Sequence, residues 1–502
     1  MKNLLLTTTC LATVTACTTA KKEVTPQKPN VLIVYVDDLG FGDVGINGAK
    51  GVQTPHVDRL AKNGVNFTDA HCSAATCTPS RYSLLTGSYA FRNQAAVLPG
   101  DAPLIIDPNK GTLASMLKDA GYTTGVIGKW HLGLGMGQVN WNEEVKPGPK
   151  EIGFDYSFLI PATGDRVPCV FLENQRVVGV DPNDPITVSY SSRVDGLPLG
   201  SEHPELLKQQ ADPQHSNTII NGISRIGYMS GGEKALWKDE DFPFVLTEKA
   251  KTFMTENKDN PFFLYFAFHD IHVPRVVNEQ FVGQSTMGPR GDAIAQMDWC
   301  VGQLVKQLED LGIAENTLII FSSDNGPVLD DGYADMAVEL VGDHQPAGPF
   351  RGAKYSIYEA GTRMPTIVYW PGKVTPKVSS AMLTQVDLYA SLAKLAGQEI
   401  APGDAPDSQD HLDAWLGKTE TGRESMLEEA YTFALRKGDW KYIKPQTGGT
   451  PDWMKNKQVE SGLEDVPQLY HLKDDLQESV NLAGNYPELV EEMAAELEKI
   501  LQ

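Results

Sequence analysis

The chain has 502 residues, of which 41% are hydrophobic and 22% charged, so it can bury a large core and is expected to divide into two domains. Its formal charge of −22 leaves no basic excess to displace counterions from a phosphate backbone, which argues against a nucleic-acid-binding surface. An anionic substrate would therefore need a local basic pocket.

The first 17 residues have the features of an export signal. Lys2 precedes an apolar and Thr-rich run that ends in "VTAC" at residues 14–17. This pattern is typical of a bacterial lipoprotein signal peptide whose Cys17 becomes the lipidated first residue, and a plain secretory signal is the alternative. We therefore expect an exported protein, periplasmic or at the outer membrane or cell surface, held to the membrane only by a lipid anchor. Residues 18–29 would form a flexible tether.

Four hydrophobic runs predict buried strands. They are "NVLIVYV" at residues 30–36, "PFFLYFAF" at 261–268, "TLIIF" at 317–321 and "TIVYW" at 366–370. Helix-like segments at 58–64, 112–121 and 293–311 lie between them. This alternation predicts an α/β fold with a large, mostly parallel central sheet flanked by helices.

The pattern changes after about residue 395. "YTFALRKGDWKYI" and "QLYHLKDD" alternate like antiparallel strands, and an amphipathic helix is expected after Pro487. We therefore expect a large domain at residues 30–394 and a smaller C-terminal α+β subdomain at 395–502. Residues 160–245 are loop-rich and are expected to form insertions near the mouth of a site.

Oxygen-bearing side chains directly follow two of the predicted strands. Asp37 and Asp38 come after the first strand, and Asp324 and Asn325 come after the run at 317–321. Such strand ends host ligands in open α/β sheets. Adjacent carboxylates repel unless a cation lies between them, and a set of oxygen ligands favours a hard cation such as Ca²⁺ or Mg²⁺ over zinc. A helix cap or an Asx turn is the alternative for either pair taken alone.

Basic side chains form three further groups. Lys129 and His131 lie two apart in "GKWHLG", and in an extended segment they would point the same way. His269 and His272 follow the strand at 261–268, where they could be metal ligands, proton carriers or polar fillers. Lys354 lies in "RGAKYSIYEAGTRMP".

Cysteine usage depends on the compartment. Cys10 and Cys17 belong to the leader, and an even number of remaining cysteines in an exported protein would by default form two disulfides. The four that remain are Cys72, Cys77, Cys169 and Cys300.

The residues after Cys77 change that expectation. "CTPSR" followed by "YSLLTG" resembles the signature of the type I sulfatases, in which the cysteine is oxidised to formylglycine. The resemblance, which is to arylsulfatase and N-acetylgalactosamine-sulfatase-like members, continues through "PNVLIVYVDDLG", "GKWHLG", "HDIHVP", "SSDNG" and "GTRMP" to "ESVNLA". It implies an alkaline-phosphatase-like fold, with residues 30–394 as the catalytic domain of a carbohydrate O-sulfatase. It also implies a separate formylglycine-generating maturation enzyme as a partner.

The resemblance further implies a role for each matching residue. Arg81 and Lys129 would stabilise the formylglycine, and His131 would be the base acting on its hydrate. His272 and Lys354 would hold the sulfate and assist the leaving oxygen, with Lys129 also contacting the substrate. A calcium ion, with magnesium less expected, would be bound by Asp37, Asp38, Asp324, Asn325 and the residue made from Cys77.

The chemistry explains why a thiol would be given up. An aldehyde hydrate carries two oxygens on one carbon, so one oxygen can attack sulfur in line while the alcohol departs. Removal of a proton from the second oxygen lets the carbonyl reform and sulfate leave by C–O cleavage, a route that a serine or thiol lacks. Positive groups in the pocket would neutralise charge on the sulfuryl group in transfer.

Two other functions stay open from the sequence. One is a phosphate- or phosphonate-ester hydrolase of the alkaline phosphatase superfamily, and the other is a catalytically silent glycan-binding lipoprotein. The expected substrate is a sulfated galactose or N-acetylgalactosamine. The loop at residues 164–177 is a candidate for sugar contacts, and a structural insertion is its alternative.

Overall fold

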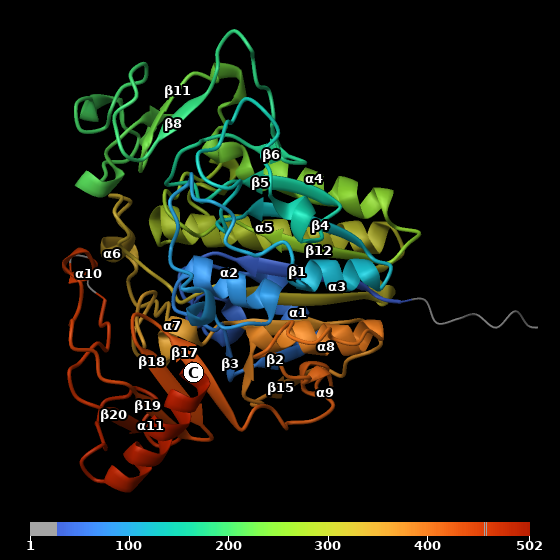
Figure 1. Cartoon of the computed structure of the whole chain (residues 1–502), viewed down its shortest axis with the longest axis vertical. Helices are drawn as coiled ribbons and strands as arrows, with labels where there is room; N and C mark the ends of the chain where they lie inside the picture. The colour runs from blue at the N-terminus through green and yellow to red at the C-terminus, as the bar shows by residue number, and fades with distance from the viewer. Residues whose placement is uncertain (1–27, 456, 458) are drawn as a thin grey trace, which may run out of the picture.

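The computed structural model describes residues 28–455, 457 and 459–502. The predicted signal peptide with Cys10 and Cys17 lies outside these residues, as does nearly all of the tether. Within the described chain, a ten-stranded sheet runs through the centre of the molecule (Figure 1). Its strands, in spatial order, are β15 (Lys377–Ser379), β2 (Val65–Phe67), β14 (Thr366–Tyr369), β13 (Thr317–Ser323), β1 (Asn30–Val36), β12 (Phe262–Ala267), β4 (Thr123–Lys129), β5 (Tyr156–Ile160), β6 (Leu172–Glu173) and β7 (Arg176–Val177).

The middle of the sheet is parallel, as the sequence predicts. β1 pairs in parallel with β13 on one side and β12 on the other, and β4 and β5 continue the parallel order. β1, β12 and β13 are buried along their whole length, which explains their unbroken hydrophobic runs.

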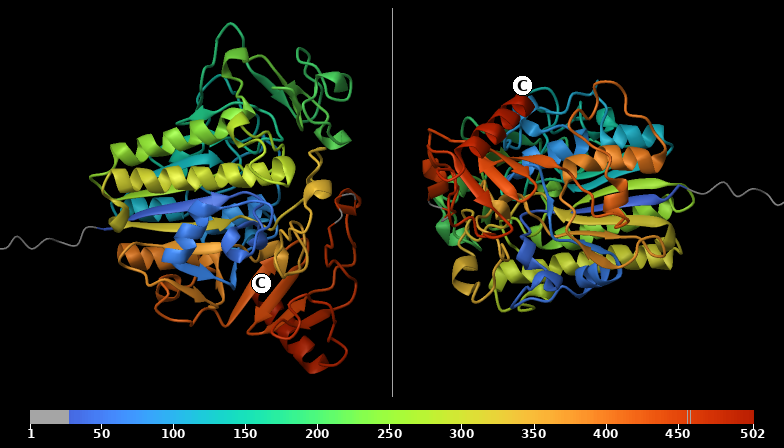
Figure 2. Two further views of the ribbon diagram at one scale, coloured as in Figure 1. Left: turned by 180° about the vertical axis from the view of Figure 1, so that it is seen from behind. Right: turned by 90° about the horizontal axis from the view of Figure 1, so that it is seen from below.

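Helices cover both faces of the sheet (Figures 1 and 2). One layer contains α1 (Pro55–Asn63), α4 (Phe242–Glu256) and α5 (Gly288–Asp310), where α5 contacts both others. The other layer contains α2 (Cys77–Thr86), α3 (Leu113–Asp119) and α8 (Leu388–Ala396), which contact one another. No helix of the described chain has the length and apolarity needed to cross a bilayer.

The strand expected at residues 366–370 is one of the antiparallel members of this mostly parallel sheet. It is β14, which pairs antiparallel with β13 in the register Ile320 to Val368. Between the two strands, the chain forms the four-residue helices α6 (Ala337–Leu340) and α7 (Glu359–Thr362) and otherwise loops. No long helix in this segment carries the chain back to the amino ends of the parallel strands. β14 therefore starts next to the carboxyl end of β13 and runs in the opposite direction.

The C-terminal part forms its own antiparallel sheet, as predicted. Strands β17 (Ser425–Glu429), β18 (Phe433–Lys437), β19 (Trp440–Ile443) and β20 (Gln468–His471) follow one another in space. Helix α11 (Pro487–Leu501) packs on this sheet through the buried side chains of Met493 and Leu497. The spacing of these two residues places them on one face of the helix.

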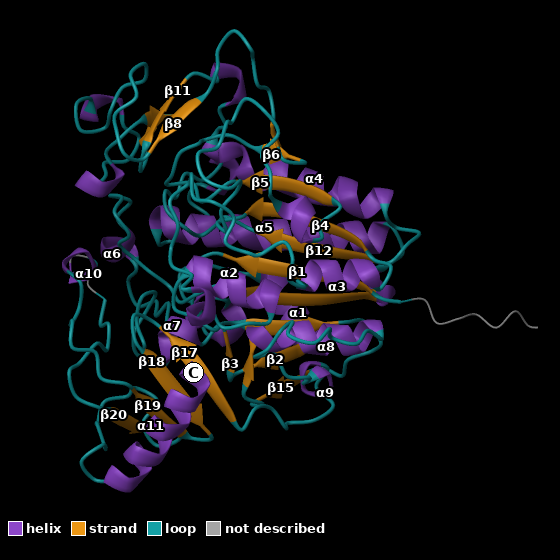
Figure 3. Cartoon of the chain, viewed as in Figure 1, coloured by secondary structure: helices purple, strands orange, loops and turns teal. Residues whose placement is uncertain are grey.

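Residues 160–245 are mostly loops (Figure 3). They contain two short antiparallel pairs, β8 (Thr187–Ser189) with β11 (Tyr228–Ser230) and β9 (Ile219–Ile220) with β10 (Ile223–Ser224).

Candidate active site

The predicted site residues meet where four parallel strands end. Asp37 follows β1, Asp324 follows β13, and Lys129 is the last residue of β4, while His272 lies five residues beyond the end of β12. Because parallel strands present their carboxyl ends at the same edge, residues that are hundreds of positions apart in sequence come together.

Carboxylates form the centre of the site. Asp37, Asp38, Asp324 and Asn325 are fully buried. Asn325 Nδ2 donates to Asp38 Oδ1 at 2.7 Å, and the Asp38 backbone N–H donates to Asp324 Oδ1 at 3.3 Å. One ligand atom each of Asp37, Asp38 and His272 lies within 4.8 Å of the others. The sequence-predicted oxygen set is therefore brought together, with an imidazole beside it.

This cluster has the donor atoms that a divalent cation needs. Asp37 Oδ1 and Asn325 Oδ1 are buried and have no hydrogen-bond partner among the described residues. Burial and the neighbouring Asp324 carboxylate raise the pKa of Asp37 well above its ordinary value. A cation bound between these oxygens would relieve both penalties, so the residues present fit a hard metal ion.

Cys77 begins helix α2, and its thiol faces a histidine. Cys77 Sγ lies 3.2 Å from His131 Nδ1, while His131 Nε2 lies 2.9 Å from the carbonyl oxygen of Leu98. A carbonyl can only accept, so Nε2 carries the proton and Nδ1 is left as an acceptor facing residue 77. Burial and the Lys129 ammonium hold the pKa of His131 well below its ordinary value. The neutral form of the imidazole is therefore favoured, with the Nδ1 lone pair facing residue 77.

The loop before Cys77 is held by the C-terminal sheet. The Ala75 N–H donates to the carbonyl of Glu429 in β17 at 2.8 Å, and the Glu429 N–H donates to the carbonyl of Ser73 at 3.1 Å. On the other side, the Tyr355 N–H donates to the Ala75 carbonyl at 2.9 Å. Backbone from two distant parts of the chain thus fixes the start of α2.

Three cations balance the carboxylates. Arg81 lies one turn after Cys77 on α2, and its Nε donates to Asp324 Oδ2 at 2.9 Å. Lys129 Nζ lies 2.5 Å from Asp37 Oδ2. Lys354 Nζ lies 2.9 Å from Asp38 Oδ2. All three cations are buried. Because each carboxylate already has a basic partner, a divalent cation would leave the site with a net positive charge suited to an anion.

The reason given for pairing Lys129 with His131 was wrong. β4 ends at Lys129, and His131 has a left-handed backbone with φ 53°, so the two residues do not share an extended segment. Both side chains still enter the site, because the turn after β4 directs His131 toward Cys77 while Lys129 contacts Asp37.

These groups open into one cavity of about 390 Å³, which we call the reaction pocket. Cys77, His131, His272 and Lys354 line it. Its other walls come from residues that the sequence did not single out: Val97, Asp165, Arg166, Gln214, His215, Asp331, Tyr355, Tyr431, Trp453 and Lys457. Asp165 and Arg166 lie in the loop proposed for sugar contacts, and Tyr355 directly follows Lys354 in the segment quoted above, but the others carry no recognisable motif.

One wall of the reaction pocket is a chain of charged groups. Arg166 NH1 donates to both carboxylate oxygens of Asp165, at 2.8 and 2.7 Å. His215 Nε2 lies 3.5 Å from Asp165, and its Nδ1 lies 2.7 Å from Asp212 Oδ1. Burial opposes protonation of His215, but these two carboxylates raise its pKa above the ordinary value. The wall therefore presents polar groups held by fixed partners.

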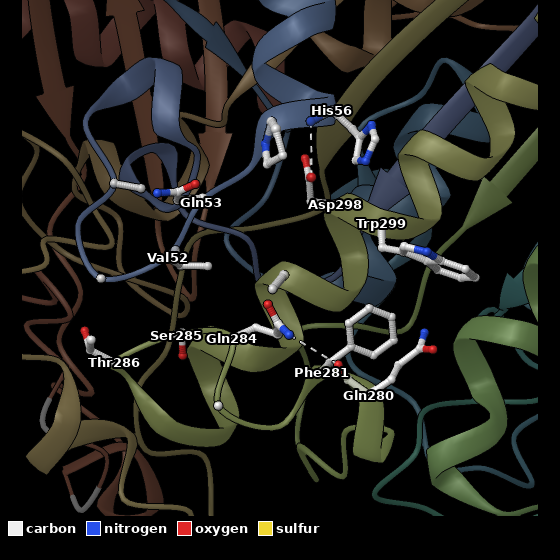
Figure 4. Close-up of a pocket in the computed structure, with 15 residues that line it drawn as sticks. Val52, Gln53, His56, Gln280, Phe281, Gln284, Ser285, Thr286, Asp298 and Trp299 are labelled. Atoms are coloured by element: carbon white, nitrogen blue, oxygen red, sulfur yellow. Dashed lines mark hydrogen bonds between the residues drawn. The ribbon is translucent and has the colours of Figure 1, made fainter.

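A second cavity, of about 930 Å³, lies between the start of α1 and α5 (Figure 4). Trp299 and Phe281 form part of its wall, and the Asp298 carboxylate accepts backbone N–H groups of His56 and Val57. These interactions cap a helix, and the residues that line the cavity include no cysteine, lysine or arginine. Despite its larger volume, this cavity lacks the chemistry of the reaction pocket.

The default expectation of two disulfides was wrong. Within the described residues, all four cysteines are buried and unpaired: Cys72, Cys77, Cys169 and Cys300. Cys72, five residues before the candidate nucleophile, directs its thiol toward backbone carbonyls of Ala74 and Thr362.

Comparison with known proteins identifies the family. The family model described as Sulfatase matches residues 29–398. The chain belongs to the sulfatase family. The resemblance seen in the sequence is confirmed, and the protein is a sulfuric ester hydrolase. Sulfatases generally use formylglycine and a divalent metal ion, which agrees with the buried Cys77 and the carboxylate cluster.

The matches to individual relatives cover nearly the whole length of this sulfatase. An N-acetylgalactosamine-6-O-sulfatase of Bacteroides thetaiotaomicron is 51% identical over 94% of this chain and 93% of the relative. Human arylsulfatase A is 31% identical over 91% of this chain and 83% of the relative. A solved structure from work on glycosaminoglycan metabolism by Bacteroides thetaiotaomicron is 51% identical, covers 95% of this chain and 99% of its own, and superposes with a TM-score of 0.92. These matches confirm the predicted fold.

Proposed function

We propose that this sulfatase hydrolyses the 6-O-sulfate ester of N-acetylgalactosamine residues in sulfated glycans. The observation that carries the proposal is the convergence of Cys77, His131, His272 and Lys354 in one pocket of about 390 Å³ with polar side walls. This volume suits one sulfated sugar ring. The sugar and the sulfated position are taken from the relative that is 51% identical and is named as an N-acetylgalactosamine-6-O-sulfatase.

We propose that Cys77 is converted to formylglycine and that Asp37, Asp38, Asp324 and Asn325 bind calcium. The hydrated aldehyde would supply a nucleophilic oxygen together with a second hydroxyl through which sulfate is later released. The metal ion would supply positive charge next to that oxygen and the sulfate. Calcium is favoured over magnesium because the protein itself offers oxygen ligands from three carboxylates and an amide, whereas magnesium usually keeps several waters and takes only one or two carboxylates.

The side chains around residue 77 would then have separate roles in the reaction. His131 Nδ1, which faces residue 77, would accept the proton whose removal expels sulfate. Arg81 and Lys129 are fixed by Asp324 and Asp37, and would hold the residue-77 oxygens. Because these partners are already oriented, little reorganisation is needed during the reaction.

His272 and Lys354 would face the sulfate ester. His272 lines the reaction pocket, and its Nδ1 lies 2.6 Å from the carbonyl oxygen of Val273, so Nδ1 carries the proton. Its Nε2 lies 3.8 Å from Asp38 Oδ2, at the carboxylate cluster. Burial and Lys354 lower the pKa of His272 well below its ordinary value, so the imidazole is neutral before substrate enters. The negative sulfate would favour its protonation, which is needed for donation to the leaving oxygen.

The cell-envelope location stays part of this proposal. The "VTAC" sequence at residues 14–17 supports export as a lipoprotein anchored at Cys17. A separate maturation enzyme would oxidise Cys77.

Release of free sulfate from a panel of defined sugars tests the proposed activity. The panel contains the 6-sulfates of N-acetylgalactosamine, galactose and N-acetylglucosamine, N-acetylgalactosamine 4-sulfate, and N-acetylgalactosamine 6-phosphate. We expect the highest kcat/KM on N-acetylgalactosamine 6-sulfate. A preference for the phosphate would overturn the sulfatase assignment, whereas a preference for another sulfated sugar would overturn only the substrate. Cys77→Ala enzyme, prepared in the same way, is the control for contaminating activity.

A further inference from the structure

We propose that the reaction pocket continues into a second cavity and that this cavity binds an uncharged sugar unit next to the sulfated one. The inference rests on the proposed function and extends it from a sulfated sugar to a sulfated oligosaccharide. We call the second cavity the side cavity. It lies between residues 210–214, residues 329–339 and helix α10 (Asp452–Lys455) and has a volume of about 600 Å³.

The two cavities adjoin each other. Gln214, Trp453 and Lys457 line both of them, so these three side chains form a common wall. Asp330 lines the side cavity, and the next residue, Asp331, lines the reaction pocket. A sugar chain that places one ring in the reaction pocket would therefore direct its neighbouring ring past Trp453.

Trp453 is placed to contact a sugar ring. Its indole makes edge contacts with Tyr355 and Tyr431, with ring centroids 5.1 and 5.8 Å apart. These contacts orient the indole, yet Trp453 stays 40% exposed at the common wall. A fixed, half-exposed aromatic ring offers a large apolar surface at little cost in conformational entropy, which suits the C–H face of a sugar.

The charges of the side cavity select the kind of sugar. Asp335 is neutralised by Arg275, whose NH1 lies 2.6 Å from its carboxylate. Lys457 is neutralised by Asp331 at 2.5 Å. The cation in the common wall is therefore already paired and is not available to a second anionic sugar.

Two acidic side chains of the side cavity have no cationic partner within the described chain. Asp330 and Glu339 line the side cavity and form no salt bridge with any residue of the described chain. A hexuronate or a second sulfate would face these two charges and be repelled. A neutral hexose or N-acetylhexosamine would instead donate its hydroxyl groups to them.

A cavity-filling variant tests the location. Ala334 is exposed and lines the side cavity but not the reaction pocket, so Ala334→Trp should block the former with the fold intact. The probes are N-acetylgalactosamine 6-sulfate and two disaccharides that extend it with a neutral hexose, at C1 or at C3. We expect kcat/KM on the better disaccharide to fall about tenfold and that on the monosaccharide to stay unchanged. Ala401→Trp, an exposed substitution on the loop after α8, is the matched control and should change neither.

A charge variant tests the selectivity. Asp330→Asn keeps the side-chain oxygen that accepts the Gly332 N–H at 3.2 Å. It should raise kcat/KM about fivefold on a disaccharide extended with a hexuronate, because a repelling charge is removed. On the neutral disaccharide kcat/KM should fall about twofold to threefold, because a hydroxyl group then donates to an amide oxygen instead of a carboxylate. Loss on all probes alike in Ala334→Trp, or no change on the disaccharides in either variant, would overturn this inference. Failure of the parent enzyme to hydrolyse the sulfated monosaccharide would overturn the proposed substrate itself, and this inference with it.

Discussion

Lys354 offers a sharp test of how the site uses its buried cations. Its ammonium lies 2.9 Å from Asp38 and 3.0 Å from Asp331, and so connects the carboxylate cluster to the wall of the reaction pocket. Lys354→Met keeps the apolar stem and removes only the charge and its hydrogen bonds. The variant should lose far more activity than stability.

The loss in stability follows from the partners that are left behind. Asp38 keeps its hydrogen bond from Asn325 at 2.7 Å, and Asp331 keeps Lys457 at 2.5 Å. Because neither carboxylate is left alone, the free energy of unfolding should fall by about 1–3 kcal/mol, as for a lost hydrogen bond to a charged group. A carboxylate left without any partner would cost about 3–5 kcal/mol. The loss of a preorganised cation facing the sulfate should lower kcat/KM by about 10²- to 10³-fold.

Denaturant unfolding in saturating calcium and the rate of sulfate release measure the two quantities separately. Lys457→Met is the matched control, because it also removes a cation from Asp331 but does not contact Asp38. We expect it to lower kcat/KM by less than about tenfold. The reasoning would be refuted if Lys354→Met kept kcat/KM within about threefold of the parent, or if both variants lost the same activity.

Three further changes test other parts of the site and fold. Cys77→Ala should abolish sulfate release with the thermal unfolding curve retained, and the native enzyme should carry an aldehyde at residue 77 in a peptide mass spectrum; an unmodified thiol there would contradict the nucleophile. Asp324→Ala should lose calcium binding in a titration calorimeter together with activity, because it removes a central carboxylate; normal binding would exclude Asp324 as a ligand. Burial raises the pKa of Asp298 to about 7, so the folded state holds this proton more tightly than the unfolded state, and stability is lost as pH rises through 7. Between about pH 5 and pH 8, the free energy of unfolding of the parent should therefore fall by about 2–3 kcal/mol more than that of Asp298→Asn. Equal falls in the two proteins, measured by denaturant unfolding, would contradict this sign.

The residues at the strand ends could be placed from the sequence for a physical reason. Asp37 and Asp324 follow buried hydrophobic runs, and neighbouring parallel strands end at the same edge, so periodicity alone predicts that these side chains meet. Cys77 and Arg81 could be identified from the local motif "CTPSR", which spans one turn of α2. His131 reached the site although the expected geometry was wrong, because a left-handed turn replaced the extended segment.

The walls of the pocket could not be placed in the same way. Lys457 contacts Asp331 across loops that have neither hydrophobic periodicity nor a fixed length, so nothing local to either residue indicates the pairing. The direction of β14 could not be assigned from the sequence for a related reason. It depends on the path of residues 324–365, which are mostly irregular, rather than on the strand's own composition.

The hydrogen bonds that join residues 73 and 75 to Glu429 have a consequence for the protein as a whole. They form a parallel bridge between Ala74 and Glu429, so the first strand of the C-terminal sheet is joined to the backbone just before the reacting residue. A truncation that deletes residues 425–502 would therefore remove more than a separate C-terminal unit. It would release the backbone that aims the nucleophile, and catalysis and the terminal sheet should therefore disappear at the same denaturant concentration.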